Sequence, residues 1–384
     1  MRVGIVTKEW PPHIYGGAGV HAFELTKALK NNLDVDVHCF GEERADATAY
    51  PLPSEFSDLN PALQAFVSDI EIAQNLGGVD IVHSHTWYAN MAGHFAALLH
   101  GLPHVITAHS LEPDRPWKAD QLGGGYALSS WAEKTAYEAA DAIIAVSNGM
   151  RADVLRAYPN LDPAKVHTIL NGVDTEKYSY SPDEALLSQH GITKPYVLFV
   201  GRITRQKGLV HLLRAWKQVS PDIGLVLAAG SPDEPAIGAE ISGLINELQA
   251  ERTNVHWFEE MLPQPQLRSL LSSASLFICP SIYEPLGIVN LEAMACQTAV
   301  LASRVGGIPE VVQDGITGEL VDYDGDAAAF EFALTTKITS MMANPAKLEQ
   351  YAQAGRKRAV EDFAWQSIAN QTQALYQSII ANRK

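Results

Sequence analysis

Positively charged residues are scarce in this chain of 384 residues. It contains 28 lysines and arginines against 44 aspartates and glutamates, which gives a formal net charge of −16 at pH 7. Nucleic acids and anionic membrane surfaces are bound by basic surfaces, so neither is expected as the main partner. A phosphorylated small molecule is compatible with this balance, but it would need a local cluster of basic side chains.

Cysteines and long apolar runs are also few. The three cysteines, Cys39, Cys279 and Cys296, stand at no spacing typical of a metal or redox site, so we interpret them as small buried residues of a reducing compartment. Residues 1–7 form too short an apolar run for a signal peptide, and no later run reaches membrane-spanning length. We therefore expect a cytoplasmic protein.

The length exceeds what one hydrophobic core usually organises, so two domains are expected. In the first half, short β-branched runs alternate with amphipathic stretches, which is typical of βαβ units around a parallel sheet. The predicted strands are 3–7, 35–40, 80–85, 104–109 and 142–147, and the predicted helices are 18–31, 62–76, 88–100 and 126–140.

The pattern loosens around residues 158–195 and then restarts. The second series has strands predicted at 196–200, 225–229, 255–258, 276–280 and 299–303, and helices at 209–219 and 235–250. We predict an α/β protein with two Rossmann-like, doubly wound domains facing a central cleft. The domains are expected to span 1–177 and 178–364, with a final helix at 365–384 packing back on the first. Ligands of such sheets bind beyond the carboxyl ends of the strands.

Residues 281–295, Ser-Ile-Tyr-Glu-Pro-Leu-Gly-Ile-Val-Asn-Leu-Glu-Ala-Met-Ala, place two carboxylates around the start of a helix. Pro285 disfavours a helical conformation for Glu284, so the helix is expected to begin directly after Glu284. The first N–H groups of a helix form an anion site suited to a phosphate or pyrophosphate. Here they belong to Leu286, Gly287, Ile288 and Val289. Glu292, in the second turn, would accept hydrogen bonds from sugar hydroxyls. The alternative is an ordinary helix with acidic residues near its start.

Residues 201–208, Gly-Arg-Ile-Thr-Arg-Gln-Lys-Gly, follow the first strand of the second domain. They resemble a P-loop, but the second glycine before the lysine and the Ser/Thr after it are missing, which disfavours a nucleoside-triphosphate hydrolase. Arg202 and Lys207 instead offer the local positive charge that a diphosphate ligand needs. A solvated basic loop is the alternative.

A loop with paired glycines, residues 8–19, follows the first strand. Gly17, Gly19 and Ala22 have the spacing of a dinucleotide fingerprint, yet about nine residues separate the glycines from the strand that this fingerprint should follow at once. We therefore reject a nicotinamide cofactor. Glycines at a helix start let the backbone approach a ligand closely, and a plain turn is the alternative.

Three histidines end predicted strands. His83 and His85 point to the same face of one strand. Zinc would need a third ligand nearby and none is evident, so a core or substrate-contacting pair is favoured. His109 ends the next strand, at the edge that faces the ligand, so a functional role is favoured over a structural one.

Together these motifs make the chain resemble the retaining glycosyltransferases of the GT-B architecture. The resemblance covers nearly the whole chain and includes the Glu-x7-Glu pattern at Glu284 and Glu292, the segment 201–208, the glycine loop, His109 and Asn-Gly-Val-Asp at 171–174. Segments 8–12, 83–87, 107–113 and 121–126 are similar to those of actinobacterial glycogen synthases and α-maltose-1-phosphate synthases. One difference is Tyr15, where many glycogen and starch synthases carry a lysine.

The resemblance implies a glucosyltransferase that uses a nucleotide sugar, with ADP-glucose favoured and UDP-glucose left open. The resemblance implies that the acceptor is an α-1,4-glucan end or glucose 1-phosphate. Arg202 and Lys207 would bind the donor diphosphate opposite the Gly16 and Gly17 amides, and Glu292 the ribose. Glu284 and His109 would surround the transferred glucose.

The acceptor would enter from the first domain near Glu9. No cofactor or metal is implied, since basic side chains and a helix N-terminus can neutralise the leaving nucleotide, and no Asp-x-Asp triplet occurs in the sequence. The alternatives are a non-catalytic sugar-nucleotide-binding protein, a sugar-nucleotide epimerase, and a glycosidase that pairs Glu284 with Glu292, although a hydrolase would not need the diphosphate cluster. The oligomeric state is open, with a homodimer among the possibilities.

Overall fold

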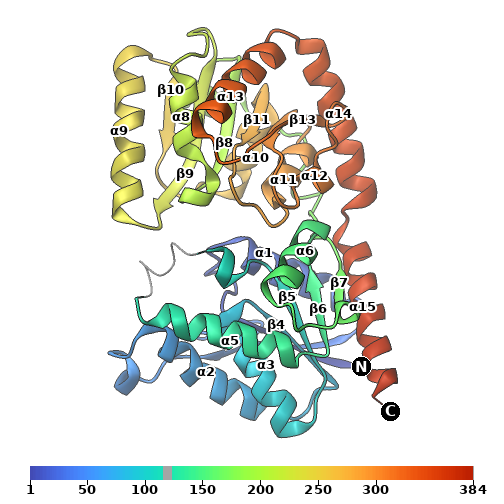
Figure 1. Ribbon diagram of the computed structural model, residues 1–384. Helices are drawn as coiled ribbons and strands as arrows, with labels where there is room; N and C mark the ends of the chain where they lie inside the picture. Colours follow the sequence, from blue (N-terminus) through green and yellow to red (C-terminus); the bar gives the residue numbers. More distant parts are fainter. Residues whose placement is uncertain (116–122, 384) are drawn as a thin grey trace. The chain divides into compact units, whose positions relative to one another are not determined.

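The structure, a computed structural model, describes residues 1–115 and 123–383 (Figure 1). The chain divides into two compact units. The first comprises Met1–Gly172 and Trp365–Lys384, and the second is Val173–Ala364. Gln121 and Leu122 of the motif at 121–126 lie outside the described residues.

A parallel sheet of seven strands forms the centre of the first unit, in the order β3-β2-β1-β4-β5-β6-β7. The strands are β1 (Arg2–Thr7), β2 (Asp34–Phe40), β3 (Thr48–Tyr50), β4 (Ile81–His85), β5 (His104–Ala108), β6 (Ala142–Ala145) and β7 (Val166–Thr168). Thr7 lies beside His85, which lies beside Thr107. The loops after β1, β4 and β5 therefore leave the sheet at the same edge.

Helices cover both faces of this sheet. They are α1 (Gly17–Leu29), α2 (Pro61–Asn75), α3 (Trp87–His100), α5 (Gly125–Ala139), α6 (Asn148–Ala157) and α15 (Trp365–Asn382). On one face, Ile5 of β1 packs in a cluster with Leu25 of α1 and Tyr376 of α15. On the other, Val6 packs in a cluster with Ile72 of α2. Because successive strand residues point to opposite faces, both must be apolar, which explains the continuous apolar runs in the sequence.

The second unit is built on a parallel sheet of six strands, in the order β10-β9-β8-β11-β12-β13. The strands are β8 (Tyr196–Ile203), β9 (Gly224–Pro232), β10 (Val255–Phe258), β11 (Leu276–Cys279), β12 (Val300–Ser303) and β13 (Gly318–Val321). The helices are α7 (Glu184–Gln189), α8 (Leu209–Trp216), α9 (Pro235–Glu251), α10 (Gln264–Ser273), α11 (Ile288–Ala295), α12 (Ile308–Val311), α13 (Ala327–Met342) and α14 (Pro345–Asp362).

The core of the second unit lies between β8 and three of these helices. Trp216 of α8 is fully buried in one cluster with Phe199 of β8, Ile241 of α9 and Leu334 of α13. This packing fixes the carboxyl end of β8, where Arg202 lies.

The predicted fold class is confirmed, since both units are Rossmann-like α/β layers around parallel sheets. The prediction missed the short strands β3, β7 and β13. All three are edge strands of their sheets. Among the described residues, no helix combines the length and the apolar character needed to cross a membrane.

Candidate functional site

The loops that follow β8 and β11 are joined through their backbones. The Ile282 amide donates a hydrogen bond of 2.8 Å to the Gln206 carbonyl. Gly208 has a φ of +64°, and a Cβ atom there would lie 1.9 Å from the carbonyl oxygen of Pro280. Glycine alone permits both this left-handed conformation and this close approach. The 3-10 turn η4 (Arg205–Lys207) is therefore held against the end of β11.

This packing brings Lys207 and Glu284 together. Lys207 Nζ donates a hydrogen bond of 2.6 Å to Glu284 Oε2, and Ser281 Oγ donates one of 3.0 Å to the same oxygen. Burial lowers the pKa of Lys207, but the adjacent Glu284 carboxylate outweighs burial, so the pKa is raised overall. Lys207 is therefore a cation at neutral pH, held by a carboxylate that is only 7% exposed.

Arg202 is held from the neighbouring strand. Its Nη1 donates hydrogen bonds of 2.8 and 3.2 Å to the two carboxylate oxygens of Asp233. Asp233 directly follows β9, which pairs with β8 in the sheet. Asp233 is not among the predicted site residues, although an acidic residue directly after an adjacent strand is a usable signal. The pair fixes the direction in which the guanidinium points.

The helix of the acidic motif begins later than the sequence predicts. It starts at Ile288 and not after Glu284, because Gly287 has a φ of +89° and breaks the helical path. A Cβ atom at Gly287 would lie 2.6 Å from the side-chain nitrogen of Asn290, so this turn requires glycine.

The N–H groups predicted as anion donors lie in this turn and in the first residues of α11. Within the part of the chain that the structure describes, no protein group accepts a hydrogen bond from the N–H groups of Leu286, Gly287, Ile288 and Val289. They come from a turn and a helix start together, and not from one helical end as predicted. A ligand with several acceptor oxygens suits such a set of donors.

Glu292 lies on α11 in a different environment from Glu284. Burial raises its pKa to about 7, although a hydrogen bond with Tyr178 and the charge of Lys177 act in the opposite direction. Its carboxyl group therefore changes protonation close to neutral pH. It can accept hydrogen bonds when ionised and also donate one when protonated.

The glycine loop of the first unit is shaped by Glu9. Glu9 Oε2 accepts hydrogen bonds from the Tyr15 and Gly16 amides, at 2.7 and 2.8 Å. A Cβ atom at Gly19 would lie 2.6 Å from the same carboxylate oxygen. The Gly16 amide thus has a protein partner, whereas the Gly17 amide makes no hydrogen bond to the other described residues.

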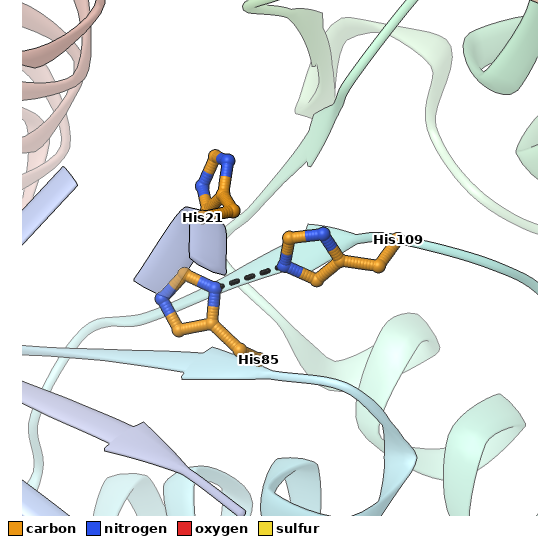
Figure 2. A group of neighbouring side chains, drawn as sticks. All are labelled: His21, His85 and His109. Atoms are coloured by element: carbon orange, nitrogen blue, oxygen red, sulfur yellow. Dashed lines mark hydrogen bonds between the residues drawn. The ribbon is translucent and has the colours of Figure 1, made fainter. Parts of the chain in front are cut away.

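His109 belongs to a group of three imidazoles that also contains His21 and His85 (Figure 2). His85 Nδ1 and His109 Nε2 are 3.1 Å apart and share a hydrogen bond. The His21 ring centroid lies 4.7 Å from that of His109 and 5.4 Å from that of His85. His21 is not among the predicted site residues, because it lies on the amphipathic helix α1 and only tertiary packing brings it to the strand ends.

His83, in contrast, is a core residue. Its Nδ1 lies 2.5 Å from the Tyr376 hydroxyl and its Nε2 lies 2.6 Å from the Thr107 hydroxyl. Both ring nitrogens therefore have partners. Its ring centroid lies 4.3 Å from that of His85, so the two rings pack against each other.

All three imidazoles of the group are neutral at pH 7. Burial lowers the pKa of His21 to about 4, against an opposing hydrogen bond with Asn171. Burial and the neighbouring imidazoles hold the pKa values of His85 and His109 well below their usual range. Each ring thus carries one N–H donor and one lone pair.

Comparison with known proteins connects these features. Residues 15–177 match the profile of glycosyltransferase family 4, and residues 183–358 match that of glycosyl transferases group 1. An α-maltose-1-phosphate synthase of Mycolicibacterium smegmatis is 54% identical over 388 residues, covering 99% of this chain and 100% of the relative. One of Mycobacterium tuberculosis is 51% identical over 387 residues, with the same coverage. The chain belongs to glycosyltransferase family 4.

The fold of this glycosyltransferase is GT-B, as the sequence predicts. A solved structure of sucrose-phosphate synthase from Thermosynechococcus elongatus matches with a TM-score of 0.81 and 25% identity, covering 99% of each chain. Arg202, Lys207 and Glu284 lie in the part matched by the second profile, and His109 in the part matched by the first. Glu9 precedes both matched parts.

Proposed function

We propose that this glycosyltransferase transfers glucose from ADP-glucose to glucose 1-phosphate and releases α-maltose 1-phosphate and ADP. The observation that carries the proposal is the identity of 54% and 51% to two α-maltose-1-phosphate synthases along essentially the entire chain. The activity serves α-1,4-glucan biosynthesis, and we infer that it takes place in the cytoplasm.

The second unit is proposed to bind the donor. Arg202 lies at the carboxyl end of β8 and Lys207 in the turn η4 that follows it, and the unbonded amides of 286–289 follow Glu284 in the chain. These groups supply positive charge and N–H donors, which a diphosphate requires in a protein of net charge −16. Glu292, which lies one helical turn after the start of α11, is proposed to bind the ribose hydroxyls.

In the proposed reaction, the bond between the anomeric carbon and the diphosphate oxygen breaks, and negative charge grows on the leaving phosphate. Lys207 and Arg202 are held in place by Glu284 and Asp233 before the reaction, so little reorganisation is needed when this charge appears. Their charges perform the role that a divalent cation performs in other transferases.

The first unit is proposed to supply the groups around the sugars. His109 is neutral, and its bond to His85 leaves its other ring nitrogen for a hydroxyl of the transferred glucose. Glu9 is proposed to contact the acceptor, and the Gly17 amide, with that of Gly16 if Glu9 releases it, to contact the donor phosphates. No side chain is assigned as a nucleophile. The acceptor hydroxyl attacks on the face that the diphosphate leaves and gives its proton to the leaving phosphate oxygen, so the anomeric configuration is retained.

A matrix of donors and acceptors tests the proposal. ADP-glucose and UDP-glucose are each incubated with glucose 1-phosphate or a maltooligosaccharide, and the products are identified by mass and by the anomeric configuration in NMR. We expect α-maltose 1-phosphate from ADP-glucose and glucose 1-phosphate. Elongation of the oligosaccharide with no sugar-phosphate product would contradict the proposed acceptor, and faster transfer from UDP-glucose would contradict the donor.

A further inference from the structure

The group of three histidines has ring nitrogens that the hydrogen bond between His85 and His109 does not use. His21, His85 and His109 each offer one ring nitrogen, and these three atoms all lie within 4.8 Å of one another (Figure 2). They come from the helix α1, the end of β4 and the residue after β5, so one rigid edge of the sheet and one packed helix fix their positions.

Two buried nitrogens of this group lack a hydrogen-bond partner among the described residues. They are Nε2 of His21 and Nε2 of His85. Nδ1 of His21 lies 2.6 Å from Oδ1 of Asn171, which can only accept, so Nδ1 carries the proton and Nε2 is a bare lone pair. A ring whose second nitrogen is oriented by an amide or carboxyl oxygen is the usual arrangement of a metal-binding histidine.

The chemistry of the group selects among cations. All three side chains are imidazoles, which coordinate a cation through a nitrogen lone pair. The group contains no carboxylate, so Mg²⁺ and Ca²⁺, which prefer oxygen ligands, are disfavoured. Nitrogen ligands favour the later first-row ions such as Zn²⁺, Co²⁺ and Cu²⁺.

We propose that His21, His85 and His109 form a binding site for a late first-row divalent cation. Zinc lies about 2.0–2.1 Å from imidazole nitrogens, so two tetrahedral ligand atoms are roughly 3.4 Å apart. His85 and His109 are already separated by 3.1 Å, so the His21 nitrogen alone must approach by roughly 1 Å, within reach of a ring rotation. The His85–His109 hydrogen bond is exchanged for two coordination bonds, and the ring that donated it moves its proton to its other nitrogen. His109 is partly exposed, which leaves a fourth position open to water.

The ion would act as an inhibitor, and this part rests on the function proposed for His109. A His109 ring that coordinates the ion can no longer contact the glucosyl group, so transfer stops while the ion is bound. Removing the ion by chelation restores the free imidazole. The enzyme would therefore work without a metal and be reversibly silenced by one.

Cobalt is the most direct probe of this site. Tag-free protein, treated with chelator and dialysed, is titrated with Co²⁺ alone, and the visible absorption is recorded. We expect one equivalent to give the intense bands of four- or five-coordinate Co²⁺ and one equivalent of Zn²⁺ to remove them. His21→Ala and His85→Asn should lose these bands, whereas His167→Ala, which changes a histidine of β7 outside the group, should keep them.

A second measurement needs no variant. In protein labelled with ¹⁵N-histidine, one equivalent of Zn²⁺ should shift the ring signals of three histidines. Weak six-coordinate cobalt bands, unchanged ring signals, or cobalt bands retained in a folded His21→Ala protein would overturn the site.

The glucosyl-transfer assay separates the two parts of the proposal. Transfer measured in chelator tests the proposed function, and its loss on adding one equivalent of Zn²⁺, at least tenfold, tests inhibition. Stoichiometric binding with unchanged turnover would leave the site standing but overturn the inhibition.

Discussion

The ammonium of Lys207 lies 2.6 Å from the carboxylate of Glu284, although the two residues are separated by 77 positions in the chain. The contact exists because η4 is pressed against the end of β11 at Gly208, where a side chain would collide with the backbone. An acidic protein thus keeps a preset cation at the point where a phosphate is proposed to leave.

Lys207→Ala and Arg202→Ala should each lower kcat by roughly a hundred- to a thousandfold, because one charge-stabilising group in a closed site contributes about 3–4 kcal/mol. Steady-state kinetics with ADP-glucose would measure this. Arg205→Ala is the control, because Arg205 lies in the same turn but its side chain is half exposed. Its Nε lies 3.7 Å from Oε2 of Glu234. A raised KM with unchanged kcat would mean that the two side chains only bind the ground state.

His109→Ala should lower kcat far more than it weakens nucleotide binding, because the imidazole is proposed to touch the transferred sugar. Turnover and the Kd for ADP, from calorimetry, are compared for the same preparation. His190→Ala, which alters an exposed histidine of the second unit, is the control. Equal losses in turnover and in ADP affinity would place His109 at the nucleotide instead.

Glu292→Gln should change the pH dependence of stability. The pKa of Glu292 rises from its ordinary value of 4.5 to about 7 on folding. Between these values the folded protein holds a proton that the unfolded chain releases, so this contribution is fully present below pH 4.5 and is lost as the pH rises through 7.

The glutamine variant keeps no titrating group at this position. Relative to the wild type, it should gain about 2–3 kcal/mol of unfolding free energy between pH 5 and pH 8. Urea unfolding at both pH values measures this, with the exposed Glu361→Gln as the control for loss of one carboxylate. A constant difference between variant and wild type at the two pH values would contradict the shifted pKa.

Gly208→Ala should impair both stability and turnover, because the added Cβ atom meets the Pro280 carbonyl oxygen at 1.9 Å and must displace the turn that carries Lys207. Gly191→Ala is a matched control, with a similar φ of +66° but no atom within 4 Å of the added Cβ. It should show only the backbone strain of about 1–2 kcal/mol. Thermal unfolding and kcat are measured for both, and equal effects would refute the proposed role of this contact.

Treatment with EDTA should leave glucosyl transfer intact, because the charges of Lys207 and Arg202 are proposed to stabilise the leaving diphosphate. The assay compares turnover before and after exhaustive chelation, with and without added Mg²⁺. Loss of activity that Mg²⁺ restores would show that the two side chains are insufficient.

The sequence predicts most of the fold because strands that are buried on both faces must be apolar throughout. The sequence also shows that Lys207 and Glu284 each follow a predicted strand. Because loops after parallel strands leave the sheet at its carboxyl edge, both residues are expected at that edge. It cannot give the start of α11, because a favourable proline at 285 is overridden by the left-handed conformation of Gly287. Propensity describes single residues, whereas this turn is set by tertiary contacts.

His21 is the clearest omission. It occupies an ordinary position on an amphipathic helix, and nothing in the local pattern distinguishes it from a core histidine. Its neighbours His85 and His109 are 64 and 88 residues away in the sequence, and Asn171 is 150 residues away. Only the docking of α1 on the sheet brings these side chains together, so no spacing rule could have found them.

The division of the chain also affects how it is made. The second unit is one continuous segment, Val173–Ala364, and its residues leave the ribosome in an unbroken series. The first unit lacks α15 until all of that segment has been synthesised, and α15 supplies Ile368 and Tyr376 to its core. The first unit therefore cannot complete its core before the second unit has been synthesised, and the apolar face that α15 covers stays exposed until then.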